Sequence, residues 1–312
     1  MKTKTYSVLL LSIALCFYYS CEKEDIQKQD KLITVDLLKA DMQSVYFINS
    51  DTGYIVGLYD TIYKTIDGGN QWSCTFSGTN EWLSAVFFPN DNTGYIVGRK
   101  GTILKSIDAG KSWSKLNSNL DANLNSLFFL SKNAGFVAGD FGIILKTIDG
   151  GNTWKSLRTN TDFALESIYF TDEVTGFAVG RAGCIIKTID GGNSWDVLDG
   201  RNKWLNSVFF VNNSIGFTVG DTGIILGTSN GGELWEIIHS DFKDDLNSVF
   251  FTDRNIGYTV GKNGIILKTN DGGSSWQKIE SGTTKGLNSL HFPNPYIGYA
   301  TGGGGTFFRI HQ

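Results

Sequence analysis

The sequence contains few of the residues that metal sites, disulfide frameworks and helical domains require. Its 312 residues include three histidines, four cysteines and three prolines. No Cys-x-x-Cys or His-x-x-x-His spacing occurs, so no metal site is predicted. After residue 20 the apolar runs are short, and none has the length and period of an amphipathic helix. These absences favour an all-β domain with no metal and no cofactor.

Runs of basic residues are absent as well. The formal net charge is −4, and no run of Lys and Arg is longer than two residues. Nucleic-acid binding needs a basic patch that neutralises phosphates. Nucleic acid is therefore not an expected partner.

An internal repeat of about 41 residues runs through the chain. A glycine followed by Tyr or Phe recurs in steps of 41 residues with one step of 40, and a tryptophan series has the same steps. The glycines are Gly53, Gly94, Gly135, Gly176, Gly216, Gly257 and Gly298, and the tryptophans are Trp72, Trp113, Trp154, Trp195, Trp235 and Trp276. A repeat of this length is typical of a propeller blade, and seven copies predict a seven-bladed β-propeller.

The sixth repeat shows the four strands of one blade, named a to d from the inside outwards. Short β-rich runs alternate there with glycine or Asn/Asp clusters. The predicted strands are Leu246–Phe251, Gly257–Gly261, Ile265–Thr269 and Trp276–Ile279.

The last repeat lacks strand d. It supplies Leu287–Phe292, Gly298–Gly302 and Thr306–Ile310, and no tryptophan strand follows. Leu32–Leu37 is a β-rich segment that precedes the first repeat and has no other partner. We predict that it forms the outermost strand of the last blade, because this pairing closes the ring and removes its open edges.

The first 20 residues are not part of the repeats. Lys2 and Lys4 precede an apolar stretch from Tyr6 to Tyr19, which is too short for a membrane span and is typical of an export signal. Cys21 stands where a bacterial lipoprotein carries its lipidated cysteine; an ordinary cleaved signal is the alternative. We predict a signal peptide over 1–20, a polar tether over 21–31 and the propeller over 32–312. The mature protein is then expected to be a monomer, anchored by lipid in the bacterial cell envelope at the outer membrane or the cell surface.

Two further cysteines lie in the repeats. Cys74 belongs to the first repeat and Cys184 to the fourth, nearly opposite in a seven-fold ring. A disulfide needs Cα atoms within about 7 Å. Both are therefore predicted to be free thiols.

Each complete repeat carries the same turn between strands c and d. Its pattern is S/T-x-D-x-G-x-x-W, as in Thr65 to Trp72, and the fifth repeat has Asn230 in place of the aspartate. An Asp side chain accepts hydrogen bonds from its own turn, and Gly supplies a positive φ angle. Because the aspartates recur in one role, we interpret them as structural, not as catalytic or calcium-binding.

This turn is the Asp box. Together with the preceding G-[YF]-x-V-G strand, it makes residues 38–312 resemble the photosystem II stability/assembly-factor family of BNR/Asp-box propellers. The wider group includes sialidases and sortilin-like receptors. The resemblance implies a non-catalytic binding scaffold whose partner is a protein or a peptide, with a glycan as another possibility.

The face opposite the Asp boxes is the predicted working surface. It carries the turns between strands b and c and the links that lead into strand a, and these vary from repeat to repeat. Aromatic and arginine side chains are enriched in binding hot spots. The candidate partner-binding residues are Trp82, Arg99, Lys100, Arg181, Arg201 and Trp204; a solvated rim is the alternative interpretation.

The second position of strand a is predicted to line the mouth of the central channel. This channel ring consists of Gln43, Asn125, Glu166, Asn206, Asn247 and Asn288, with Ser84 in the second repeat. A wet channel explains such polar side chains without any specific ligand.

A carbohydrate-binding or sialidase-like glycoside hydrolase propeller is the alternative function, and a structural or adhesive envelope component is a third. Sialidase chemistry needs converging arginines and an acid pair. Arg309 lies in a sialidase-like Phe-Arg-Ile segment, but it aligns with a lysine repeated in strand c. Glu166 is the one carboxylate of the channel ring, and the sequence indicates no acid partner near it. We therefore predict that the protein is not an enzyme.

Overall fold

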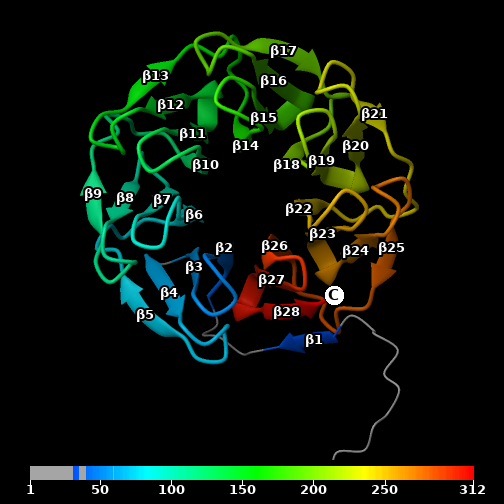
Figure 1. Cartoon of the computed structure of the whole chain (residues 1–312), viewed down its shortest axis with the longest axis horizontal. Coiled ribbons are helices and arrows are strands. Elements are labelled where there is room, and N and C mark those ends of the chain that lie inside the picture. Colours follow the sequence, from blue (N-terminus) through cyan, green and yellow to red (C-terminus); the bar gives the residue numbers. More distant parts are fainter. Residues whose placement is uncertain (1–30, 35–39, 59) are drawn as a thin grey trace, which may run out of the picture.

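Seven four-stranded antiparallel sheets are arranged in a ring around a central axis in the computed structural model, which describes residues 31–34, 40–58 and 60–312 (Figure 1). The inner strands a are β2 (Met42–Phe47), β6 (Leu83–Phe87), β10 (Leu124–Phe129), β14 (Leu165–Phe170), β18 (Leu205–Phe210), β22 (Leu246–Phe251) and β26 (Leu287–Asn294). Strands b are β3 (Gly53–Gly57), β7 (Gly94–Gly98), β11 (Gly135–Gly139), β15 (Gly176–Gly180), β19 (Gly216–Gly220), β23 (Gly257–Gly261) and β27 (Ile297–Gly302). The predicted all-β seven-bladed propeller is confirmed.

The outer half of each blade follows the same order. Strands c are β4 (Thr61–Thr65), β8 (Ile103–Ser106), β12 (Ile144–Thr147), β16 (Cys184–Thr188), β20 (Ile225–Thr228), β24 (Ile266–Thr269) and β28 (Phe307–His311). Strands d are β5 (Ser73–Phe76), β9 (Ser114–Leu116), β13 (Lys155–Leu157), β17 (Asp196–Asp199), β21 (Glu236–Ile237) and β25 (Gln277–Ile279). Short 3₁₀ turns join b to c in blades 3 to 7: η1 (Asp140–Gly142), η2 (Arg181–Gly183), η3 (Asp221–Gly223), η4 (Lys262–Gly264) and η5 (Gly303–Gly305). The strands predicted for the sixth repeat are correct to within one residue.

The seventh blade takes its outer strand from the start of the described chain. β1 (Lys31–Thr34) pairs antiparallel with β28, and Leu32 lies opposite Ile310. Figure 1 shows the two coloured ends of the ribbon side by side at this blade. The predicted closure is confirmed for residues 31–34, whereas residues 35–37 of the predicted strand lie outside the described residues.

The hydrophobic core consists of layers between neighbouring blades. Strand b is buried along its whole length in blades 1 to 6 and from Gly298 onwards in blade 7, because each of its faces packs against another sheet. Between blades 3 and 4, Phe136 stacks on Phe170 with 4.0 Å between ring centroids, and Trp195 meets Phe170 edge-on at 6.0 Å. The Asp-box tryptophan therefore fills the space between blades, as predicted.

The Asp box holds its turn through one carboxylate. In blade 3 the Asp149 Oδ1 atom accepts hydrogen bonds from the Thr147 hydroxyl and the Thr153 amide, both at 2.9 Å. The Thr153 hydroxyl donates to the other oxygen at 2.6 Å. The hydrogen bonds from Thr153 lower the pKa of Asp149 to about 2. In blade 5 the Asn230 amide oxygen accepts the matching bonds from Thr228 and Leu234, so a neutral side chain also holds this turn.

In several blades, a cationic side chain on strand c donates a hydrogen bond to the Asp-box turn of the next blade. The Lys105 and Lys146 ammonium groups donate to the carbonyl oxygens of Gly150 and Gly191, both at 2.6 Å. Arg309 of blade 7 donates in the same way to the Gly68 carbonyl of blade 1, and its guanidinium also reaches Asn70. Arg309 thus plays the same role as the lysine repeated in strand c, as the sequence indicated.

Cys74 on β5 is exposed, Cys184 on β16 is buried, and both are free thiols, as predicted. The described residues include no helix long and apolar enough to cross a membrane. They also include no cluster of three His, Cys, Asp or Glu side chains able to hold a metal ion. The predicted signal peptide, most of the tether and Cys21 lie outside the described residues.

Candidate functional site

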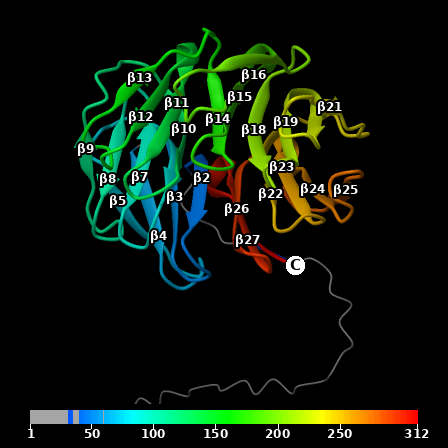
Figure 2. The ribbon, with the colours of Figure 1, turned by 45° about the horizontal axis from the view of Figure 1, so that its top comes forward.

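The two faces of the ring differ in what they display. The b–c face carries the turns between strands b and c, and the Asp-box face carries the turns between c and d. Strands run between these faces in every blade (Figure 2). On the b–c face, a cavity of about 230 Å³ opens at the channel mouth. It is lined by Gln43, Trp82, Leu83, Ser84, Arg99, Asn123, Asn125, Asp140, Glu166 and Arg181.

A β-bulge at the start of each strand a positions the residues of the channel ring. The register between strands a and b shifts between Leu124 and Ser126, and again between Leu165 and Ser167. The residues skipped are Asn125 and Glu166, which line the channel-mouth cavity. A bulge re-aims a side chain that regular pleating would direct elsewhere.

Four asparagines of the channel ring join neighbouring blades. Asn125 donates to the Leu165 carbonyl at 3.0 Å. The Nδ2 atoms of Asn206, Asn247 and Asn288 donate to the equivalent carbonyls of Leu246, Leu287 and Met42. These side chains are structural connectors, and only Asn125 among them also lines the cavity. Gln43, Ser84 and Glu166 are the ring members that line the cavity and are not asparagines.

Two arginines stack on the two predicted tryptophans. The Arg99 guanidinium lies 3.5 Å from the Trp82 ring centroid within blade 2. Arg181 of blade 4 lies 4.7 Å from the ring of Trp204, which belongs to blade 5. Such cation–π contacts hold a guanidinium in place while its edge stays available to a ligand.

The two arginines differ in their electrostatic partners. Arg181 pairs with Glu166 at 3.2 Å. Within the described part of the chain, Arg99 has no carboxylate partner, and its side chain is exposed. In the cavity, the charge of Arg181 is therefore paired with that of Glu166, whereas the charge of Arg99 is available to a ligand.

Glu166 has acidic neighbours, contrary to the sequence-based expectation. Burial raises the pKa of Glu166, and the charges of Asp140 and Asp221 raise it further, while the bond to Arg181 opposes the shift. Asp140 lines the same cavity and accepts hydrogen bonds from Asn123 and Asn125 at 2.9 and 3.2 Å. The expectation failed because Asp140 lies in a b–c turn of the preceding blade and reaches Glu166 only through the ring geometry.

Not every predicted residue joins this site. Trp82, Arg99 and Arg181 line the cavity, and Trp204 contacts it through Arg181. Lys100 pairs instead with Glu81 at 2.9 Å on the exposed rim. Arg201 lies in the link after β17, outside the cavity lining, with a φ of 65°.

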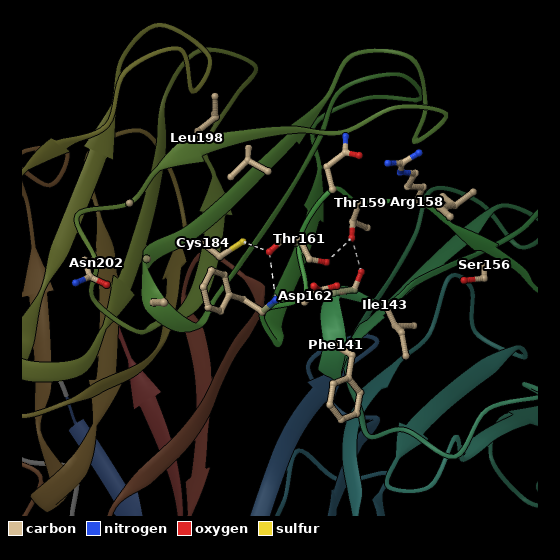
Figure 3. A pocket seen from close by; sticks show the side chains of 18 residues that line it. Phe141, Ile143, Ser156, Arg158, Thr159, Thr161, Asp162, Cys184, Leu198 and Asn202 are labelled. Atoms are coloured by element: carbon tan, nitrogen blue, oxygen red, sulfur yellow. Dashed lines mark hydrogen bonds between the residues drawn. The ribbon is translucent and has the colours of Figure 1, made fainter.

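A larger groove lies between the outer parts of blades 3 and 4 (Figure 3). Its volume is about 1120 Å³, and its walls come from β13, β17 and the adjoining turns. The exposed rings of Phe141 and Phe163 flank it, and Cys184 lies at its floor, with its sulfur 3.6 Å from the Thr161 hydroxyl. The sequence analysis did not predict this groove. Its signal in the sequence is the one 40-residue step of the repeat, which shortens the link between blades 4 and 5 at Gly200, and Gly200 lines the groove.

The repeated blades, Asp boxes and ring closure define the class of Asp-box β-propellers. The model of the family described as photosynthesis system II assembly factor YCF48 matches residues 24–124, 73–165, 116–206, 150–243 and 198–285. The chain belongs to this family. No curated protein matches it.

Solved structures show the same fold at low identity. One described as YCF48 bound to D1 peptide is 21% identical with a TM-score of 0.79, covering 91% of this chain and 96% of its own. YCF48 from Cyanidioschyzon merolae is 19% identical with a TM-score of 0.76, covering 90% and 98%. An ancestral GH74 enzyme is 14% identical with a TM-score of 0.71, covering 87% of this chain and 45% of its own.

Proposed function

We propose that this protein is a non-catalytic scaffold that binds a protein or peptide segment at the channel mouth of the b–c face. The observation that carries the proposal is Arg99, held flat on Trp82 at 3.5 Å beside the cavity and lacking a carboxylate partner among the described residues. A fixed guanidinium with a free edge fits a carboxylate of the partner, and the tryptophan supplies apolar area beside it.

The comparisons support a peptide as the partner class. The family is that of an assembly factor, and a structurally similar YCF48 has been solved with a D1 peptide bound. For this chain we propose an assembly-factor-like role in the cell envelope, with the protein exported, lipidated at Cys21 and monomeric. The sequence features that favour export and lipidation are the apolar stretch before Cys21 and the small residue that precedes it.

Capture from membranes tests the function. Wild-type protein, Arg99→Ala/Arg181→Ala and Trp204→Ala are used to recover partners from detergent-solubilised membranes. We expect the variants to lose bound protein roughly thirty-fold, since an Arg or aromatic anchor commonly contributes about 2 kcal/mol. Their thermal melts should stay near that of the wild type, because these side chains are exposed.

Asp67→Ala is the matched control on the other face. It should lower stability and leave capture by the folded fraction intact. Equal capture by wild type and the arginine variant would rule out the b–c site. Loss of capture in Asp67→Ala at unchanged stability would place the site on the Asp-box face.

A glycoside hydrolase is the second candidate, and one observation favours it. Glu166, with its raised pKa, and Asp140 line one cavity, and a glycosidase uses two carboxyl groups, one of which has a raised pKa. Hydrolysis of a glycan panel that Glu166→Gln abolishes would replace the scaffold proposal. No cleavage by either protein would exclude this candidate for the sugars tested.

A further inference from the structure

We propose that the Asp-box face lies against a lipid bilayer, with an arc of exposed isoleucines in contact with the membrane interface. This inference goes beyond the peptide site, because it concerns the opposite face of the ring. Two independent observations carry it: the apolar arc itself and the side of the ring from which the N-terminal segment leaves.

The arc occupies one position of the Asp box in four consecutive blades. The residue between the Ser/Thr and the Asp is Ile66, Ile107, Ile148 and Ile189 in blades 1 to 4, with exposures of 74, 74, 74 and 67%. The turn does not require isoleucine, since Ser229 and Asn270 occupy this position in blades 5 and 6 with the same hydrogen bonds around them. Four large apolar side chains are thus displayed where polar ones suffice for folding.

The geometry of the arc fits a planar partner. The same turn holds each isoleucine, with matching bonds from Thr65 to Asp67 in blade 1 and from Thr188 to Asp190 in blade 4. Equivalent positions in a ring of equal blades project to the same height, so the four side chains reach one plane. They stand on separate blades and line neither the channel-mouth cavity nor the groove between blades 3 and 4, whereas a bilayer interface accepts each apolar side chain independently.

The chain emerges on this same face. β28 starts directly after the b–c turn η5 and ends at His311 towards the Asp-box face. Lys31, the first described residue, lies opposite His311. Tyr296, which is 69% exposed in the a–b loop of the same blade, lies beside this exit, and its carbonyl accepts a hydrogen bond from Gln312. Tyrosine is enriched at membrane interfaces because its ring is amphipathic.

The length of the preceding segment keeps the ring close to a membrane-held Cys21. Nine residues separate Cys21 from Lys31, and an extended chain of that length spans at most ~35 Å. The exit side and the arc do not depend on lipidation, but an anchor at Cys21 would hold this face towards the lipid. The peptide site then faces away from the membrane.

The charges of this face indicate which lipids it prefers. Its Asp-box carboxylates, including Asp108 and Asp149, stay ionised because hydrogen bonds lower their pKa values. The strand-c cations Lys105 and Lys146 lie at the same turns, so the face carries both signs of charge, and contact through isoleucine should not need anionic lipid and should change little with salt.

Hydrogen–deuterium exchange of the full chain on phosphatidylcholine vesicles tests the orientation. We expect slower exchange in the Asp-box turns of blades 1 to 4 and none of this slowing in those of blades 5 and 6 or in the b–c turns. Slowing at the b–c turns, or at neither face, would overturn the proposal. Slowing that needs native membranes and is absent on pure lipid would mean that a protein covers this face.

A quadruple variant isolates the arc. Ile66→Ser/Ile107→Ser/Ile148→Ser/Ile189→Ser copies the Ser229 of blade 5, so its melting temperature should be unchanged. In the Cys21→Ser chain, which cannot carry the predicted lipid, the quadruple change should reduce vesicle binding roughly tenfold or more relative to Cys21→Ser alone, because four apolar contacts are lost while both proteins keep the same N-terminal stretch. The matched control is Phe141→Ser/Phe163→Ser, which removes exposed apolar surface from the b–c face and should not change vesicle binding.

The two proposals fail separately. Peptide capture should survive the isoleucine changes, and vesicle binding should survive Arg99→Ala/Arg181→Ala. Vesicle binding that is equal in the quadruple variant and the wild type would refute the role of the arc whatever the capture assay shows.

Discussion

At the scale of single residues, His291 is the exception in a closed girdle of aromatic side chains, one from strand a of each blade. The other members are Tyr46, Phe87, Phe128, Tyr169, Phe209 and Phe250. Its neighbours in the girdle are Tyr46 and Phe250, at 4.4 and 5.6 Å between centroids. The His291 Nδ1 atom accepts a hydrogen bond from the Phe47 amide at 3.2 Å across the seam between blades 7 and 1. The imidazole must be neutral to accept this bond, and burial lowers the pKa of His291 to about 3.

This histidine predicts a loss of stability in mild acid. The unfolded chain binds a proton near pH 6.5, whereas the folded chain does not until about pH 3, so stability should fall by about 1.4 kcal/mol per pH unit between these values. His291→Phe, which copies Phe250 of blade 6, should remove this slope. Thermal melts at pH 7 and 4.5 measure it, and an equal slope in both proteins would contradict the assignment.

The Asp box predicts a second residue-scale effect. Asp149→Asn should be nearly neutral because Asn230 holds the same turn in blade 5, whereas Asp149→Ala should lower the melting temperature by roughly 2–4 °C. The stability from the ionised Asp149 is present above about pH 4 and should be lost as the pH falls towards its folded pKa of about 2. Thermal melts of both variants at neutral pH provide the comparison. An equal fall in melting temperature would mean that the charge of Asp149, and not the turn geometry, stabilises the fold.

At the scale of strands, the seam between blades 7 and 1 depends on β28. Arg309 should be replaceable by lysine, because Lys105 and Lys146 reach the same carbonyl in their own blades. Arg309→Ala should cost about 2 kcal/mol, typical of a lost hydrogen bond to a charged group. Denaturant unfolding measures the difference, and equal destabilisation by lysine and alanine would show that the bond geometry is specific to arginine.

The strands were predictable because the repeat contains strands a to c seven times and strand d six times. Periodicity located β22 and β23 to the residue and identified the segment that pairs with β28. The channel-mouth cavity was predictable only in part. Trp82 and Arg99 are unusual within the repeat and stand out, but Asp140 is an ordinary turn aspartate in sequence. Its place in the same cavity as Glu166 arises from a bulge and from blade packing, which residue spacing does not encode.

At the scale of the whole molecule, the ring separates two surfaces that the same blades support. One gathers the Arg–Trp stacks and the channel-mouth cavity, and the other repeats the Asp-box turn with isoleucines on four blades. Strands connect the faces, so a partner bound at one face, as we propose, would be held at a fixed height above a surface that covers the other. On both faces, the residues that differ between blades indicate a candidate binding surface. The Asp-box pattern alone does not reveal these residues.

Closure by β1 gives the chain a fixed order of completion. The first described strand finds its partner only in the last residues of the sequence, since Lys31 pairs with His311. A polypeptide that lacks β28 therefore keeps an unsatisfied strand edge, and such edges invite aggregation and proteolysis. The joint between β1 and β28 thus acts as a checkpoint on ring closure: only a chain that carries both strands can hide the edge by which quality-control proteases would recognise it.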